Sequence, residues 1–153
     1  MSSYFKLNKH IQDIKIEETY GNCFVTFIPG GFSIFDDNTP LTGEHYHNSY
    51  ELCYIINGEG KYFHNEKTYI IKKNDIIISD IKTKHEIKLN QKNGSLNLIF
   101  FFINIKGRNQ NIEEFKGYKE KLLHKFLLSH NIIKKSEEHI SSYLNFLENY
   151  LTY

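Results

Sequence analysis

Short runs of apolar and aromatic residues, separated by turn-forming residues, dominate the first two thirds of this chain. Between the runs lie glycine, proline, asparagine and aspartate, the residues that turns require. A short strand is expected near residues 14–16, and Pro29-Gly30-Gly31 is expected to break the next strand in two. The remaining strand-like runs are 22–28, 32–35, 45–56, 61–64, 67–71, 76–78, 85–89 and 96–105. Short strands at such spacing predict one domain, a sandwich or barrel of two antiparallel sheets.

One of these runs carries potential ligand side chains at even spacing. His45, His47 and Glu51 are separated by even numbers of residues, and even spacing on a strand places side chains on one face. The apolar run 52–56 follows directly, so the sequence predicts two imidazoles and a carboxylate on one face of a strand that enters the core. The turn signal Asn57-Gly58-Glu59-Gly60 then ends this strand.

A fourth candidate, His85, follows a short turn at the start of the run 85–89. The alternation in this run places His85, Ile87 and Leu89 inward and the charged residues between them outward. We therefore expect His45, His47, Glu51 and His85 to point into one cavity.

Two uses of these four side chains are open. Nitrogen and oxygen donors of this kind bind divalent zinc, iron, manganese or nickel, with coordination positions left for a substrate. Alternatively, the histidines form hydrogen bonds within the core or with an organic ligand. Tyr54 and Tyr62 are candidates to line a ligand pocket, although tyrosines often simply pack strands together with a hydrated hydroxyl. His64 is expected to lie at the surface or rim, and the other histidines are expected to be solvated.

The character of the sequence changes at Gly107. Apolar residues then recur at three- and four-residue steps, which predicts helices starting near residues 111 and 136. We therefore divide the chain into a barrel, 1–107, and a helical segment, 108–153. One stripe of large apolar side chains in the last helix predicts a homodimer, although it could also pack on its own barrel. This stripe consists of Ile140, Tyr143, Leu144, Leu147, Tyr150 and Leu151.

Composition argues against several function classes. The 19 basic and 18 acidic residues give a net charge of +1, and Arg108 is the single arginine, so no basic surface for nucleic acid is evident. No apolar run is long enough to span a bilayer, and the N-terminus does not resemble a signal peptide. Two cysteines in strand-like runs indicate buried free thiols, which favours the cytoplasm. Neither a nucleophile elbow nor a glycine-rich phosphate loop occurs.

Two motifs resemble those of the cupin superfamily. The first is Gly43-x-His45-x-His47-x3-Glu51-x6-Gly58, and the second runs from Asn74-Asp75 to Asp80-Ile81-Lys82-x2-His85. The second departs from the cupin pattern, because Asn74 and Lys82 replace glycines, Asp80 replaces a proline and Leu89 replaces an asparagine. The four positions that bind metal in cupins nevertheless keep residues able to act as ligands. The resemblance implies a mainly β cupin barrel, and here C-terminal α-helices follow it.

A closer resemblance is to the N-terminal sensing domain of AraC-type transcription regulators. It rests on His45-Tyr46-His47-x3-Glu51-Leu52-x-Tyr54-Ile55-x2-Gly58-x-Gly60, on 69–78 and His85, and on the helical tail. The resemblance implies a barrel that binds a small-molecule effector, often without metal, and a tail that dimerises. Such regulators bind DNA through helix-turn-helix units after this region, and this chain ends before them. We therefore expect part of a longer regulator; the alternative is a free-standing metal-dependent cupin enzyme, such as a dioxygenase, isomerase or lyase.

Overall fold

A computed structural model describes residues 14–20, 23–37, 43–90, 94–107 and 133–135. Within them lie eight strands, and every paired neighbour is antiparallel. The strands are β1 (Ile16–Tyr20), β2 (Cys23–Phe35), β3 (Tyr50–His64), β4 (Lys67–Lys72), β5 (Asp75–Ser79), β6 (His85–Leu89), β7 (Leu96–Gly107) and β8 (Ile133–Lys135). The predicted mainly β architecture is confirmed. The described residues include no helix long and apolar enough to cross a membrane.

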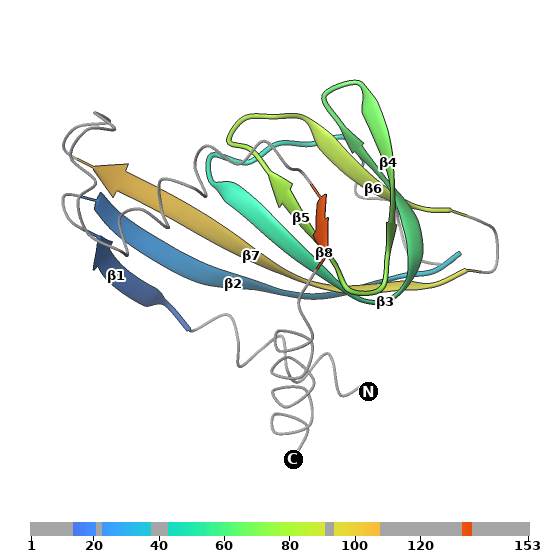
Figure 1. The fold of residues 1–153 in the computed structure, drawn as a ribbon, viewed down its shortest axis with the longest axis horizontal. Coiled ribbons are helices and arrows are strands. Elements are labelled where there is room, and N and C mark those ends of the chain that lie inside the picture. The colour runs from blue at the N-terminus through green and yellow to red at the C-terminus, as the bar shows by residue number, and fades with distance from the viewer. Residues whose placement is uncertain (1–13, 21–22, 38–42, 91–93, 108–132, 136–153) are drawn as a thin grey trace, which may run out of the picture.

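The long strand β3 belongs to two sheets (Figure 1). Its first half pairs with β7 and β5, and its second half pairs with β4 and β6. The larger sheet has the order β1-β2-β7-β3-β5-β8. The predicted end of this long strand at Asn57-Gly58-Glu59-Gly60 is wrong, because β3 continues to His64. Its pairing with β7 shifts register between Ile55 and Asn57 instead. Gly58 follows with a φ of 89°, and a Cβ there would lie 1.9 Å from the carbonyl oxygen of Ser95. Glycine is required at this position, because any side chain would collide with β7's neighbouring backbone.

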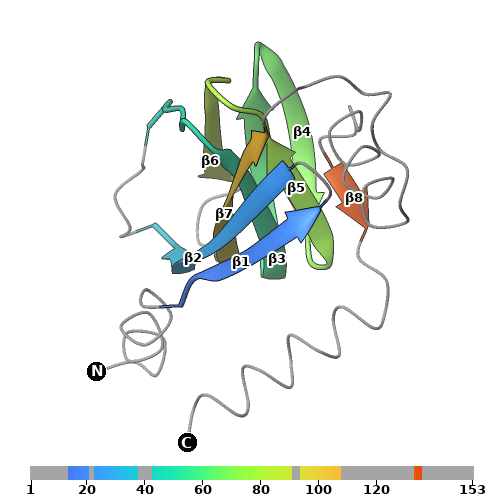
Figure 2. The ribbon, with the colours of Figure 1, turned by 90° about the vertical axis from the view of Figure 1, so that its left-hand side faces the viewer.

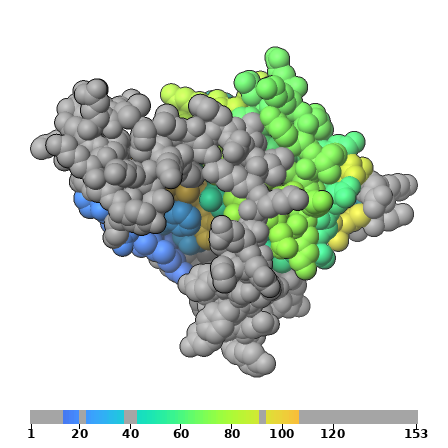
Figure 3. All heavy atoms as spheres, in the orientation of Figure 1, coloured from blue at the N-terminus to red at the C-terminus, as the bar shows by residue number. Residues whose placement is uncertain are grey.

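The buried core lies between the two halves of the barrel. Its members come from six different strands and consist of Phe35, Cys53, Ile55, Tyr62, Ile71, Ile77, Ile87, Leu96 and Leu98. Figure 2 shows β1, β2 and β7 side by side, as their pairing requires. On the other sheet, β4 lies at the surface and its residue Ile70 is 54% exposed; its light green atoms are visible in Figure 3.

The predicted strand-like runs 61–64 and 67–71 form a hairpin around Asn65-Glu66. It joins β3 to β4, and both turn residues have positive φ angles, 46° and 68°. Two left-handed residues between antiparallel strands form the type of turn that matches the strands' twist. Two positions where the cupin pattern has glycine also have positive φ angles, which are 71° at Asn74 and 58° at Lys82. The backbone therefore keeps the glycine conformation although the glycines are absent.

The predicted break at Pro29-Gly30-Gly31 is wrong, because β2 continues through it. The strand accommodates these residues as a bulge, with a register shift against β7 between Pro29 and Gly31.

A second difference lies beyond Gly107, where only helices were expected. Strand β8 pairs there with β5, so the segment 108–153 contributes a strand to the barrel's larger sheet. The expected helices from 111 and 136, and the apolar stripe on the second, lie outside the described residues.

Candidate functional site

Two of the four candidate ligands, His45 and His85, are held together by backbone pairing. The amide of each donates a hydrogen bond to the other's carbonyl oxygen, at 3.1 and 2.9 Å. Their rings meet edge to face with 4.6 Å between centroids. The amide of Lys82 donates to the carbonyl oxygen of His47 at 2.8 Å and so fixes the segment that carries both imidazoles. The left-handed turn at Lys82 thus positions the histidines.

The prediction that His45 and His47 lie on the same strand as Glu51 is wrong. Strand β3 starts at Tyr50, and the two histidines precede it in an extended segment joined to β6 by an isolated bridge. The segment still alternates, since Glu44 and Tyr46 are exposed while both histidines are partly buried. Even spacing therefore correctly predicted that both histidines point to the same side as Glu51. Their segment, however, pairs with β6 and is not part of β3.

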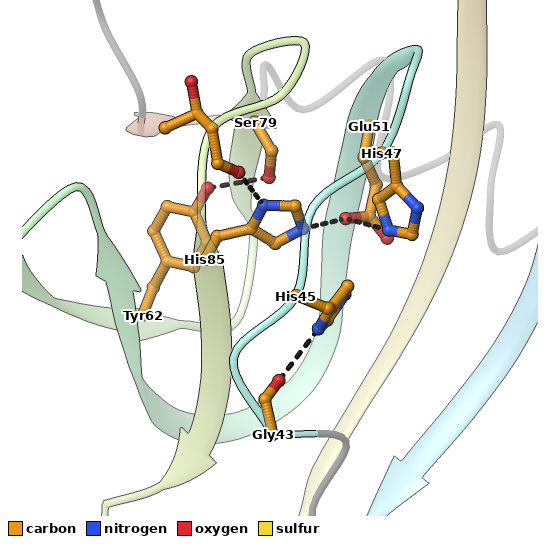
Figure 4. Close-up of polar contacts among 8 residues, drawn as sticks. Gly43, His45, His47, Glu51, Tyr62, Ser79 and His85 are labelled. Atoms are coloured by element: carbon orange, nitrogen blue, oxygen red, sulfur yellow. Dashed lines mark hydrogen bonds and ion pairs between the residues drawn. The ribbon is translucent and has the colours of Figure 1, made fainter.

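All four side chains converge on one point. Oε2 of Glu51 lies 2.8 Å from Nε2 of His85 and 3.6 Å from Nε2 of His47. One potential ligand atom from each of His45, His47, Glu51 and His85 lies within 4.8 Å of the others. Figure 4 shows His47, Glu51 and His85 pointing toward one another, with His45 beside them. We call these four residues the histidine–glutamate cluster.

Backbone carbonyls determine which ring nitrogens face the cluster. Nδ1 of His45 lies 2.8 Å from the carbonyl oxygen of Gly43, and Nδ1 of His85 lies 2.8 Å from that of Thr83. A carbonyl only accepts, so both Nδ1 atoms carry the proton and donate it. Nε2 of a neutral His45 therefore presents a lone pair. Nε2 of His85 faces a carboxylate, so the pair needs a proton or a cation between the two atoms.

The charge state of the cluster follows from this geometry. Burial opposes protonation of His85, but its hydrogen bonds to Glu51 and Thr83 and the charge of Glu51 outweigh burial and raise its pKa. His47 behaves in the opposite way, because burial and the neighbouring histidines lower its pKa against the attraction of Glu51. Nε2 of His47 is a buried atom without a hydrogen-bond partner among the described residues. In the absence of a cation, the site thus holds one ion pair and at least one unsatisfied nitrogen.

A cavity of about 140 Å³ adjoins the cluster. Besides the cluster it is lined mainly by apolar side chains, which are Phe35, Cys53, Ile87, Leu98, Phe100 and Phe102, together with Ser33. Burial raises the pKa of the Cys53 thiol well above its usual range, and Glu51 raises it further. Cys53 is therefore a neutral thiol that donates a hydrogen bond to the carboxylate.

The cluster fits a divalent cation. Three imidazoles and one carboxylate supply the nitrogen and oxygen donors that zinc, iron, manganese and nickel accept. Two of the imidazoles are oriented by Nδ1–H bonds to carbonyls, which is the usual arrangement behind metal-bound histidines. The unsatisfied Nε2 of His47 would also gain a partner. His45, His47, Glu51 and His85 are therefore the residues that would hold a metal.

Tyr54 and Tyr62, expected to line a ligand pocket, do not line this cavity. The Tyr54 hydroxyl donates to Oδ1 of Asn74 at 2.9 Å, and the Tyr62 hydroxyl lies 2.7 Å from Oγ of Ser79. Tyr54 follows Cys53 in β3, so its side chain points to the opposite face. Tyr62 is only 1% exposed and packs in the core, where burial raises its pKa.

The prediction for His64 is also wrong, because this residue is 5% exposed rather than at the surface. It pairs in register with His85, and its ring lies beside that of Tyr62. The sequence reasoning also missed the aromatic lining from β7. A signal was available, because Leu98, Phe100 and Phe102 alternate in the apolar run 96–105 and so share one face. That run is apolar on both faces, so alternation alone did not indicate which face was inside.

Sequence comparison relates this barrel to a family of ligand-binding domains. The profile of the AraC-like ligand binding domain matches residues 31–97, which include the whole cluster. The chain is also 39% identical over 44 residues to the "Uncharacterized HTH-type transcriptional regulator YfiF" of Bacillus subtilis. That match covers 29% of this chain and 14% of the relative, so the chain corresponds to a small part of that protein's length.

Two solved structures are similar to part of this chain. A predicted oxalate decarboxylase from Thermotoga maritima has 21% identity and a TM-score of 0.44, covering 63% of this chain and 95% of its own. A cupin protein from Bacteroides fragilis has 14% identity and a TM-score of 0.43, covering 69% and 88%. Residues 31–97 of this chain are thus similar to the AraC-like ligand binding domain.

Proposed function

We propose that this chain is the effector-sensing and dimerisation part of an AraC-type transcription regulator in the cytoplasm. The observation that carries the proposal is that the matched region, residues 31–97, contains a cavity beside a polar cluster. A cavity with mostly apolar walls and a few convergent polar groups is typical of small-molecule sites. The effector binds against the histidine–glutamate cluster, and the protein acts as a binding module rather than an enzyme.

Binding is coupled to the region beyond the barrel through β5. Glu51 pairs in register with Ser79 of β5, and the other end of β5 pairs with β8. A shift of Glu51 on effector binding therefore has a short path to the segment 108–153. The apolar stripe of that segment forms the homodimer, and a helix-turn-helix region outside this chain binds the DNA. The effector regulates by binding one dimer arrangement more tightly than the other.

A metal-dependent cupin enzyme is the second candidate, because four ligand-capable side chains converge within 4.8 Å. A divalent cation in the cluster would supply a Lewis acid for a substrate oxygen. The chain's own residues would hold that cation, orient the substrate against the Phe100 and Phe102 rings, and exclude water. The cavity offers no further acid or base beyond the cluster among its lining residues, so a proton transfer would have to use a cluster residue.

The decisive experiment screens the purified chain for small-molecule binding and measures its metal content. A library of small sugars, alcohols and aromatic acids is tested by thermal unfolding, with and without EDTA. A saturating effector at 100 times its Kd stabilises the fold by about 2.7 kcal/mol, which raises Tm by several degrees. Metal is measured by elemental analysis, and the association state by light scattering.

The outcomes separate the two functions. An effector that stabilises the chain without being consumed supports the sensing proposal, as does a dimer whose dissociation constant changes with effector. Metal-dependent turnover of a bound compound would contradict the sensing proposal and support the metal-dependent enzyme. A chain that binds no compound and stays monomeric at tens of micromolar would remove the basis for a sensor.

A further inference from the structure

The cavity changes from polar to apolar along the strands that form it. Strand register places Glu51 opposite Phe102, Cys53 opposite Phe100 and Ile55 opposite Leu98. The cluster therefore lies at the level of Phe102, and each step of two residues along β7 leads further into apolar surroundings. Beyond the cluster, the lining residues with a polar side-chain atom are Ser33 and Cys53. A ligand in this cavity thus has one polar end and an otherwise apolar body.

Aromatic rings form a continuous wall from the cluster inward. The ring of His47 meets that of Phe102 at 4.9 Å between centroids, and Phe102 meets Phe100 at 5.7 Å, both edge to face. Gly30 makes room for this wall, because a Cβ there would lie 2.2 Å from the Phe100 ring. Such a wall favours a planar ring, which gains additional energy from edge-to-face or offset contacts.

The volume indicates the size of the ligand part that the cavity encloses. A cavity of about 150 Å³ accommodates a benzene molecule, and this one measures about 140 Å³. A sugar of similar size carries hydroxyls on every side, and the apolar walls would leave most of them without partners. Buried hydroxyls without partners are unfavourable by kilocalories each, so a sugar is excluded by the lining rather than by its volume.

The cluster selects the polar end of the ligand. Nε2 of His45 and the Glu51 carboxylate present acceptors, while the protons of His85 are directed at Thr83 and Glu51. A hydroxyl complements such a site, because it donates to these acceptors. A carboxylate would instead face the charge of Glu51.

We propose, building on the sensing function above, that the effector is a single-ring aromatic alcohol or phenol. Its hydroxyl donates to the histidine–glutamate cluster, and its ring contacts Phe100 and Phe102. This assigns the chemical class of the effector and identifies the two phenylalanines as the residues that determine specificity.

The test is calorimetric titration of the chain in EDTA, which keeps metal out of the comparison. The probes are phenol, benzyl alcohol, 2-naphthol, benzoate and arabinose. We expect phenol or benzyl alcohol to bind with a Kd below about 1 mM, within the efficiency of ligands this small. The two-ring 2-naphthol should bind at least tenfold more weakly because it exceeds the cavity, and benzoate and arabinose should not bind.

A matched pair of variants tests the ring contacts. Phe100→Leu removes a ring from the cavity, and Phe101→Leu removes one from the opposite face of β7, where Phe101 contacts Phe27. Phe100→Leu should weaken binding of the single-ring alcohol about 2- to 12-fold, the value of one aromatic contact, while Phe101→Leu leaves it within twofold. If Phe100→Leu does not fold, the size limit seen with 2-naphthol tests the cavity in the unmodified chain.

Several results would overturn the inference. Preferential binding of arabinose or benzoate in EDTA would do so and leave the sensing function in place with another effector class. Equal binding of 2-naphthol and phenol would show that the cavity does not select a single ring and would overturn the assigned class. If none of the five probes binds, the assigned class is wrong, and the wider library screen then decides separately whether the chain is a sensor.

Discussion

Replacing Glu51 with glutamine tests the charge state of the cluster most directly. The substitution keeps the shape of the side chain and removes the charge that Nε2 of His85 contacts at 2.8 Å. Glu51 is 9% exposed and His85 is 3% exposed, so solvent does not replace the lost partner. A hydrogen bond to a charged group contributes about 1.5–3 kcal/mol, and a buried charge left unpaired is unfavourable by about 3–5 kcal/mol.

The direction of the pH dependence follows from the raised pKa of His85. A histidine whose pKa is higher in the folded state stabilises the fold fully below its unfolded pKa of about 6.5. This stabilisation disappears as the pH rises through the folded pKa. In Glu51→Gln, burial is the main remaining influence on His85 and disfavours its charge. The variant should therefore lose about 3 kcal/mol at pH 5.5, and the loss should shrink as the pH rises toward 9.

The assay is urea unfolding followed by circular dichroism at pH 5.5, 7 and 9, with EDTA present to exclude metal. Glu44→Gln is the matched control, because Glu44 forms an exposed ion pair with Lys84 and should leave stability unchanged within the error of the measurement at any pH. Equal losses for Glu51→Gln at pH 5.5 and pH 9 would refute the reasoning. Such a result would mean that the proton is not shared between Glu51 and His85.

Three further predictions concern backbone strain, a buried hydroxyl pair and the dimer. Lys82→Gly should stabilise the fold by about 0.5–1 kcal/mol in urea unfolding, because a lysine at a φ of 58° is strained, whereas Lys82→Ala should bring no gain. Tyr62→Phe should destabilise by about 1–3 kcal/mol by leaving Oγ of Ser79 without its partner, and adding Ser79→Ala should recover part of that loss. Effector binding should be unchanged in Tyr62→Phe. A loss of binding would show that Tyr62 contacts the ligand. Replacing Leu144 and Leu147 with aspartate should give monomers with a folded barrel by light scattering and circular dichroism; unfolding would place the stripe in the core instead.

Local signals in the sequence predicted most strands correctly. The Asn65-Glu66 hairpin and the strands from β4 to β7 follow from apolar runs and turn residues, which act over a few neighbours. The turn signal at residues 57–60 misled, because β3 continues through it. The convergence of the cluster was also predictable, since even spacing put His45, His47 and Glu51 on one side of an extended chain. Two local motifs are sufficient to identify the four candidate ligands, without long-range information.

Long-range packing decided the features that local signals missed. Pro29-Gly30-Gly31 looks like a break, yet β7 pairs on both sides of it and makes it a bulge. His64 is polar and was expected at the surface or rim, yet its pairing with β6 buries it. The three residues of β8 lie between predicted helices, and only their pairing with β5 makes them a strand. In each case the stabilising partner is distant in sequence, and no property of the segment itself indicates it.

The sequence by itself thus determined the mainly β architecture, the Asn65-Glu66 turn and the residue types of the site, because side-chain periodicity and turn chemistry are local. Only the tertiary structure decided the partners of those residues. It showed that carbonyls of Gly43 and Thr83 orient two imidazoles, that Glu51 and His85 share a buried contact, and that β7 supplies the cavity's aromatic wall. These contacts depend on strand order and register, which are set by the packing of the whole barrel.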